Sequence, residues 1–288
     1  MIITTAEELR NLTGSYYANN DFKKIENMVK GVEQELCATL GMQTLDGLQG
    51  DAKLAAQQAI AYMATMRFYR LNDISHEDAG RKVKMDRENE ARPFEWQVAR
   101  DDRAHLEEYY RALDRLIDAL QEDETFRQSK LWQRQQQLLV KDADSLSYLT
   151  GTDPSPWLYL RMIPYLADSQ RFVQKAYGDE LPHDGTNEEL EHAAQMAVAL
   201  GAIALMGRRT SLQAMPYGLM KLFESDGGGN RQEAAALDRL DDYLKHLSKE
   251  QHYWLNEMKQ LRDEAAGKET ATHLQMPEND PKNKFMRV

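Results

Sequence analysis

The sequence contains one cysteine, Cys37, among 288 residues. A single cysteine cannot form a disulfide within the chain, so the fold has to depend on its apolar core. The opening residues, MIITTAEELR, lack the basic start and the apolar run of a signal peptide. Together these absences predict that the chain is made and folds in a reducing cytoplasm.

Long hydrophobic runs are also missing. The most apolar window, residues 193–206 (AAQMAVALGAIALM), is interrupted by Gln195 and is too short to cross a hydrocarbon layer of about 30 Å. This window predicts a buried helix, and no membrane partner is expected.

Sequence patterns of common catalytic sites are absent. The chain has no G-x-S-x-G elbow, no Walker loop and no H-E-x-x-H pair. The glycines at 227–229 lack the lysine and the preceding strand that a phosphate loop requires. The sequence therefore predicts a protein that is not an enzyme, with no catalytic residues and no cofactor.

One E-x-x-H pair, Glu189 and His192, has the helical spacing by which di-iron bundles place two ligands on one face. Such sites need a second helical copy, and the other pair, Glu180 and His183, contains Pro182 and falls in a loop. We predict no metal site. A helical metal-dependent enzyme using Glu189 and His192 is the competing class.

Basic residues are outnumbered, with 36 Lys and Arg against 47 Asp and Glu and a formal charge of -11. The chain as a whole should repel phosphate backbones, so specific nucleic-acid binding is not expected. Residues 80–103 are densely charged, but their basic and acidic side chains alternate, which makes the stretch polyampholytic rather than basic.

What the sequence does contain is helical periodicity. Apolar residues recur at steps of three and four through most of the chain, which predicts an all-α fold, a multi-helix bundle. Helices are expected after Thr5, from Asn20 or Asp21 to Gly41, at about 51–71, 93–122, 126–140, 143–149, 165–177, 188–206 and 211–224, and over a long final segment.

Two helix starts are less regular. Residues 156–164 carry Pro164, so they are predicted to form either the first half of a kinked helix or an extended piece leading into helix 165–177. Thr186 and Glu189 match a capping box for helix 188–206.

The final helix has a coiled-coil-like seam with one polar member, Gln251. Tyr243 and Leu255 widen its apolar face, which favours packing inside the fold over pairing between chains, though both stay open. The seam consists of Leu237, Leu240, Leu244, Leu247, Gln251, Trp254, Met258 and Leu261.

These patterns predict one helical domain over residues 1–266, with a subdivision near 150–155 left open at the turn signal GTDPSP, and an extended C-terminal tail over 267–288. The tail is polar and ends in KNKFMRV. It is predicted to be either disordered or an arm that becomes ordered on a neighbouring subunit, with Phe285, Met286 and Val288 as anchors.

A short extended arm is expected near residues 72–92, where no helical period survives. Pro93 suits the first turn of the helix that follows. Phe94 and Trp96 then lie about 200° apart on that helix, so one is expected in the core and the other at a contact. Arg92, Phe94 and Trp96 are the candidate contact residues here, and an ordinary surface loop is the alternative.

Four stretches, IITTAEELRNL, LNDISHEDAGRKVKM, RPFEWQ and SPWLYLRMIPYL, resemble an uncharacterised family of virion-region proteins from phages and prophages of Bacteroidetes. The similarity in order spans most of the chain but not the final helix, and the motifs are short. Members of that family are similar to head-tail connector, or adaptor, proteins, which are helical subunits that form a ring beneath the portal. The resemblance implies no catalytic residues.

The resemblance implies a structural protein that acts in the bacterial cytoplasm during assembly and then in the virion. Its expected partners are other copies of itself, in a ring homo-oligomer, and the portal and tail proteins. Mixed charges and an aromatic anchor at residues 80–97 suit a contact between subunits. A monomeric cytoplasmic helical binding module is the third alternative.

Overall fold

The computed structural model describes residues 2–14, 21–72, 74–77, 80–83, 95–178, 180–182, 185, 187–209 and 229–265. For residues 74–77, 80–83, 95 and 229–240 it describes the backbone alone. The predicted helix at 211–224 and the predicted tail lie outside these residues.

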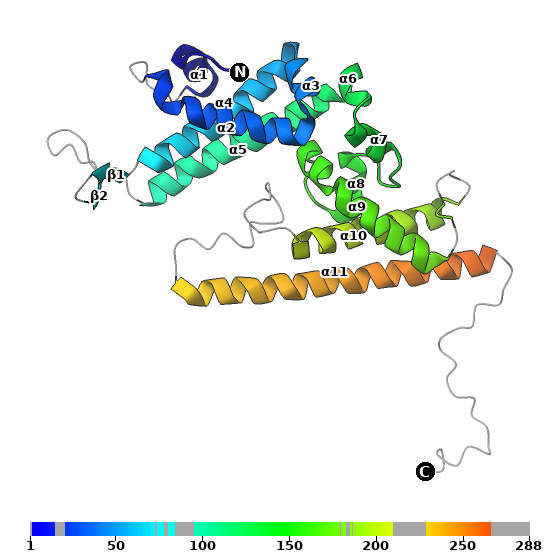
Figure 1. The fold of residues 1–288 in the computed structure, drawn as a ribbon. Coiled ribbons are helices and arrows are strands. Elements are labelled where there is room, and N and C mark those ends of the chain that lie inside the picture. The colour runs from blue at the N-terminus through cyan, green and yellow to red at the C-terminus, as the bar shows by residue number, and fades with distance from the viewer. Residues whose placement is uncertain are drawn as a thin grey trace, which may run out of the picture.

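The all-α class is confirmed (Figure 1). The only β structure in the described ranges is one antiparallel hairpin, in which Ile74 pairs with Val83. It lies within the predicted extended arm. The elements are α1 (Ala6–Thr13), α2 (Phe22–Leu40), α3 (Met42–Asp46), α4 (Gly50–Asn72), β1 (Ile74–Glu77), β2 (Gly80–Val83), α5 (Glu95–Leu120), α6 (Glu124–Arg127), α7 (Lys130–Gln136), α8 (Ala143–Thr150), α9 (Pro156–Tyr177), α10 (Glu188–Arg209) and α11 (Gly229–Ala265).

The first core, which we call the N-terminal core, lies between α1, α2, α4 and α5. Thr5 closes a capping box with Glu8 at the start of α1, and Asp21 caps α2, as the sequence predicts. Helix α4 is buried on several sides rather than on one face, because its alanines allow α2 and α5 to approach it closely.

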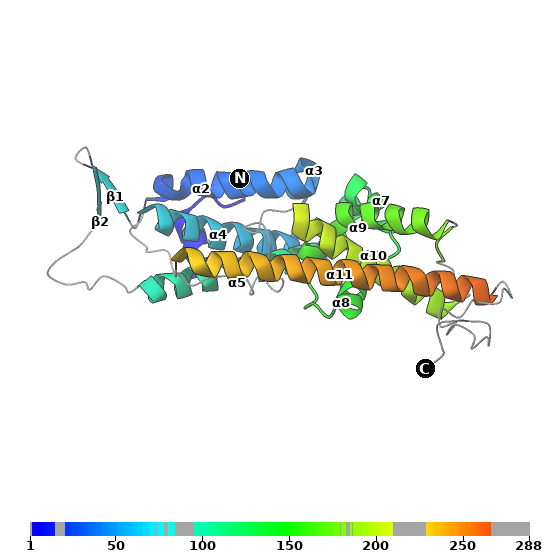
Figure 2. The same ribbon diagram turned by 90° about the horizontal axis from the view of Figure 1, so that it is seen from below.

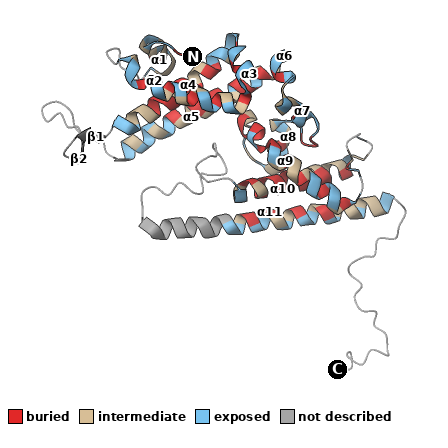
Figure 3. Cartoon of the chain, in the orientation of Figure 1, coloured by how far each residue is buried: buried red, intermediate tan, exposed pale blue. Residues whose placement is uncertain are grey.

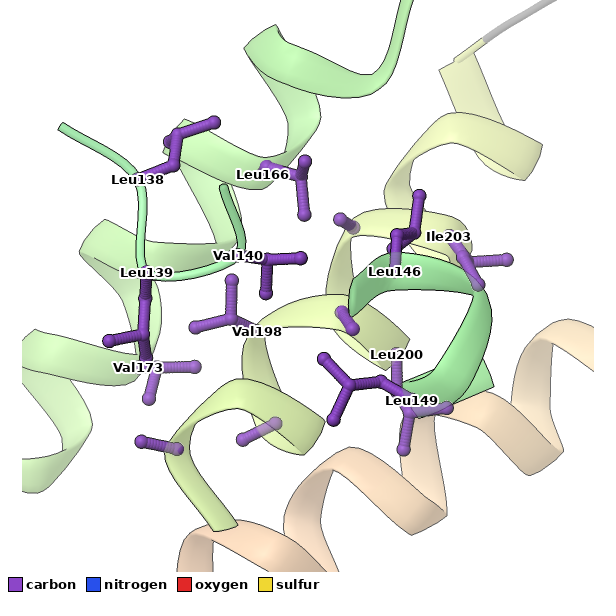
Figure 4. Close-up of a cluster of buried hydrophobic side chains, with 14 of the residues drawn as sticks. Leu138, Leu139, Val140, Leu146, Leu149, Leu166, Val173, Val198, Leu200 and Ile203 are labelled. Atoms are coloured by element: carbon purple, nitrogen blue, oxygen red, sulfur yellow. The ribbon is translucent and has the colours of Figure 1, made fainter. Parts of the chain in front are cut away.

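The second core, the C-terminal core, is formed by α8, α9, α10 and α11 together with residues 138–140. Figure 4 shows Leu146 of α8 beside Ile203 of α10, and Val140 beside Val198 of α10. Helix α10 is the central element, with α9 and α11 packed along it. The predicted buried helix is confirmed, and it extends to Arg209.

Helix α9 belongs to both cores. Trp157 and Leu160 pack in the N-terminal core, whereas Leu158, Met162 and Leu166 pack in the C-terminal core. The turn at 150–155 immediately precedes this helix. One helix thus links two apolar clusters, and the domain count stays a prediction.

The single helix predicted at 126–140 is wrong. The chain forms two short helices there, α6 and α7, separated at Gln128 and Ser129. Ser129 Oγ accepts a hydrogen bond from the Trp132 amide at 3.2 Å, and Asp123 Oδ1 accepts one from the Phe126 amide at 2.7 Å. These two caps satisfy backbone groups that a continuous helix would satisfy itself, so each starts a separate helix.

Residues 156–177 form one helix, so the alternative of an extended piece at 156–164 is wrong. Ser155 caps it and Pro156 occupies its first turn, where a proline needs no intrahelical partner. Pro164 is accommodated inside the helix. The missing proline amide leaves the Leu160 carbonyl without its usual helical donor, which weakens the helix locally without ending it.

The N-cap of α10 is one residue later than the predicted capping box places it. Asn187 Oδ1 accepts the hydrogen bond from the Leu190 amide at 3.0 Å, so Asn187 caps the helix. Glu191, rather than Glu189, reaches back, and its Oε2 accepts from the Gly185 amide at 3.2 Å. Thr186 lies outside the described residues.

Helix α11 packs inside the fold over residues 244–261, which answers the question left open for that part of its seam. In Figures 1 and 2 it is the longest element and runs along one side of the molecule. Gln251 is only 9% exposed and donates to the Ala197 carbonyl at 3.1 Å and to Ser169 Oγ at 3.5 Å. This polar contact fixes the register of α11 against α9 and α10.

Asp114 of α5 ties the start of α9 to the N-terminal core. Its Oδ1 accepts from Ser155 Oγ at 2.7 Å and from the Trp157 amide at 3.0 Å. Burial raises the pKa of the Asp114 carboxyl, and these hydrogen bonds offset the rise only in part. The folded chain therefore binds this proton more tightly than the unfolded chain does.

A raised pKa means that the stabilising contribution is full below the unfolded value and is lost as pH rises through the folded value. The substitution Asp114→Asn keeps an acceptor oxygen but removes the titration. In urea titrations, we expect the unfolding free energy of the variant to rise relative to that of the parent as the pH increases from about 4, the unfolded value of an aspartate. If the unfolding free energy of the parent rises relative to that of the variant over this range, the hydrogen bonds, not burial, dominate the pKa of Asp114.

Candidate interaction surface

Trp96 is the one predicted contact residue that lies among the described residues. It is in the first turn of α5 and is 61% exposed. Figure 3 shows that exposed residues predominate at this end of α5. The remaining predicted contact residues, Arg92, Phe94, Phe285, Met286 and Val288, lie outside the described residues.

The helices on either side of the arm are held together at its base. Arg70 near the end of α4 and Asp102 near the start of α5 form an ion pair, with Nε and Oδ2 2.8 Å apart. One turn further along α5, the buried His105 ring meets the rings of Tyr62 and Tyr69 edge-on, at centroid distances of 6.1 and 6.4 Å.

These contacts define where the hairpin and Trp96 are presented. In Figures 1 and 2 the hairpin projects from the end of the molecule at which α4 stops and α5 starts. Residues 73–94 therefore leave and re-enter a fixed pair of helix ends, and Trp96 lies directly at the return point. An exposed tryptophan on a rigid base suits a protein contact.

Glu189 and His192, the candidate metal ligands, do not face a common site. Glu189 is exposed, whereas the His192 ring is half-buried and stands edge-on to Trp254, with centroids 5.6 Å apart and an interplanar angle of 87°. Among the described residues no group of three His, Cys, Asp or Glu side chains is arranged to hold a metal ion. His183 lies outside those residues, and Glu180 is exposed.

His192 instead belongs to a row of rings that we call the aromatic strip: Tyr148 of α8, His192 of α10, and Trp254 and Tyr253 of α11. Neighbouring centroids along it are 6.4 Å (Tyr148 to His192), 5.6 Å (His192 to Trp254) and 5.4 Å (Trp254 to Tyr253) apart. Tyr148 is 82% exposed and Tyr253 is 60% exposed. Three helices therefore contribute to one exposed aromatic surface.

The sequence contained part of the signal for this strip. Trp254 is a seam position, so its half-buried packing on the C-terminal core was predicted, and Tyr253 follows as its outward neighbour. Tyr148 could not be assigned to the same surface from periodicity, because its distance to His192 depends on how α8 packs on α10.

Carboxylates surround the aromatic strip. Glu188 and Glu189 lie one turn before His192, and Asp144 lies one turn before Tyr148, all exposed. Glu250 and Glu257 flank the Trp254 and Tyr253 pair on α11, while Lys249 is the neighbouring cation. The field at this surface is thus predominantly negative.

A cleft lies beside α9. It has a volume of about 270 Å³. Its lining combines four glutamines and three leucines with three charged side chains, Lys141, Glu180 and Glu191. The Gln170 amide is already engaged, because its Oε1 accepts from the Leu139 amide at 2.7 Å and its Nε2 donates to the Gln137 carbonyl at 3.1 Å. These two hydrogen bonds hold the connection after α7 against α9.

Helix α10 is the one described helix whose length and composition would allow it to cross a membrane, and 67% of its apolar window is buried inside the molecule. It forms the centre of the C-terminal core.

Comparison with known proteins adds no assignment: no protein-family model, curated protein or solved structure matches the chain. The resemblance to virion-region proteins therefore stays a prediction.

Proposed function

We propose that this chain is a structural protein of a phage virion, a head-tail connector subunit that assembles into a ring below the portal. The observation that carries the proposal is Trp96, a large apolar side chain exposed at the root of the arm. The motif resemblance supplies the class of assembly, and the excess of acidic residues suits a channel through which DNA slides without binding.

In this proposal the arm and the tail carry the contacts between subunits. Arg92, Phe94 and Trp96 would form the first contact, and Phe285, Met286 and Val288 the second. Large aromatic anchors surrounded by mixed charges are typical of such interfaces, because the anchor provides buried area and the charges set register.

The metal-dependent enzyme has weaker support. His192 packs its ring against Trp254 and Tyr148, so coordination through this side chain would require the aromatic strip to rearrange. The monomeric binding module has one observation in its favour, the aromatic strip, and a stable monomer that binds a peptide there would identify it.

Replacing Trp96 with alanine is expected to weaken self-assembly about 30-fold, since an exposed aromatic anchor contributes about 2 kcal/mol at the centre of an interface. The fold should be unaffected, with an unfolding free energy within about 0.5 kcal/mol of the parent. Light scattering over a concentration series measures the assembly, and circular dichroism with urea measures the fold.

Met42→Ala is the matched control for this prediction. Met42 is 63% exposed, close to the value for Trp96, but lies on α3, away from the arm. Equal effects of the two substitutions on assembly would remove the special role of Trp96.

A further inference from the structure

We propose that, in the free subunit, the segment Lys282–Val288 (KNKFMRV) folds back and covers the aromatic strip of its own chain. The strip is formed by Tyr148, His192, Trp254 and Tyr253. The inference does not depend on the ring, because it concerns a contact within one chain.

The aromatic strip and the segment 282–288 carry apolar groups that can pack against each other. The strip presents aromatic rings from three helices, and two of these rings, Tyr148 and Tyr253, are largely exposed. The segment carries Phe285, Met286 and Val288, an aromatic ring, a thioether and a branched aliphatic group. Aromatic and sulfur contacts of this kind add favourable energy to simple burial of apolar area.

The two surfaces are also complementary in charge. The segment has three cations, Lys282, Lys284 and Arg287, and no acidic side chain, in a chain whose formal charge is -11. The strip is bordered by Asp144, Glu188, Glu189, Glu250 and Glu257, with Lys249 as the neighbouring cation. The cations beside the apolar anchors would thus face the carboxylates that border the strip.

Composition separates this segment from the other stretches outside the described residues. Residues 84–94 balance their basic side chains with acidic ones, and residues 210–228 have one cation, Lys221, against Glu224 and Asp226. The latter stretch also follows Arg209, which is about 25 Å along α10 from His192 at 1.5 Å per residue.

The connection between α11 and the segment 282–288 is long enough for the segment to reach the aromatic strip of its own chain. Ala265 is the last residue of α11, and Trp254 lies about 17 Å before it along the helix axis. Residues 266–281 form a 16-residue connection, whose root-mean-square length as a flexible chain is about 20–24 Å. A connection whose length matches the span gives the highest effective concentration, in the millimolar range, so a contact within the chain outcompetes one between dilute chains.

The end of α11, from which the connection starts, is held in place. Arg262 Nη1 donates to the Tyr177 carbonyl at 2.8 Å, and its guanidinium lies over the Tyr177 ring at 5.2 Å. This contact fastens the end of α11 to the end of α9, so the tail begins at a defined point near the strip. Assembly can then exchange the segment between neighbouring subunits without changing the contact, as in domain swapping.

Photocrosslinking in the full-length chain tests the proposal. p-Benzoylphenylalanine is placed at Phe285, and the products are separated on a denaturing gel and mapped by mass spectrometry after trypsin. We expect a product of monomer mass joined to peptide 142–161, which carries Tyr148, or to peptide 250–259, which carries Tyr253 and Trp254. The crosslinking is done at a concentration at which light scattering detects only the free subunit. Because the gel is denaturing, it then distinguishes contacts within a chain from contacts between chains.

Two controls sharpen the result. The same probe at Leu274, in the connection, should not select these peptides. The double substitution Tyr148→Ala and Tyr253→Ala removes the two most exposed rings, so it should leave the fold intact and lower the yield from position 285 about five-fold.

The proposal is overturned if the strip peptides are joined mainly in a product of dimer mass, if crosslinks spread over unrelated peptides, or if the double substitution leaves the yield unchanged. Light scattering on the same protein reports assembly separately. A monomer-mass crosslink without any oligomer would support the docked tail while removing the ring proposal.

Discussion

Gly201→Ala is expected to destabilise the fold by about 2–3 kcal/mol, through overpacking and loss of a buried polar contact. A Cβ atom at this position would lie 2.0 Å from Gln251 Nε2 and 2.4 Å from Ser169 Oγ. Gln251 has a flexible side chain, but it is buried and hydrogen-bonded, so moving it away costs those hydrogen bonds.

Gly31→Ala, the same chemical change at another position, is expected to stabilise the fold. Gly31 is inside α2, and a Cβ there would have no neighbouring heavy atom within 4 Å. Alanine is favoured over glycine inside a helix by about 1 kcal/mol, so this variant should be stabilised by up to that amount. Urea unfolding measures both, and a stable Gly201→Ala variant would show that the crossing of α9, α10 and α11 is looser than described.

Phe126→Ala is expected to cost about 3–5 kcal/mol of unfolding free energy, the range for deleting a buried aromatic side chain. Phe126 is 1% exposed and meets the Trp132 ring edge-on, with centroids 6.0 Å apart. It is the main apolar side chain of the four-residue helix α6, so its loss should also change the fluorescence of Trp132.

Phe172→Ala is the control, since Phe172 is 47% exposed on α9. The same truncation there should cost less than about 1 kcal/mol, because little buried surface is lost. Similar costs at the two positions in chemical denaturation would contradict the burial of Phe126 in the N-terminal core.

Helix existence could be predicted because each long helix has its own apolar period. Four members of the α11 seam, Leu244, Leu247, Gln251 and Met258, are buried as expected. Asp21 and Thr5 cap the helices that follow them. Such patterns are local, and local spacing is enough to define an amphipathic face.

The helix boundaries that were predicted wrongly lie where apolar spacing and capping residues favour different boundaries. Apolar spacing extended a helix through Ser129, but its side chain caps a new helix instead. Thr186 and Asn187 are both good caps, and sequence does not rank them, whereas the structure selects Asn187.

The aromatic strip shows a different limit. Each ring is visible in the sequence, but the contact of Tyr148 with His192 depends on the packing of two helices that are far apart along the chain. Sequence reasoning singled out His192 only for its spacing from Glu189. Its actual neighbours are rings, which changes the kind of chemistry that this surface suits.

The native mass of the full-length protein tests the central claim, that this chain works by assembling. We would measure it by light scattering over a concentration series, alone and with a phage portal protein, and determine metal content on the same sample. We expect a discrete, metal-free homo-oligomer that forms alone or on the portal. A chain that stays monomeric in both conditions, or that carries one bound metal per monomer, would contradict it.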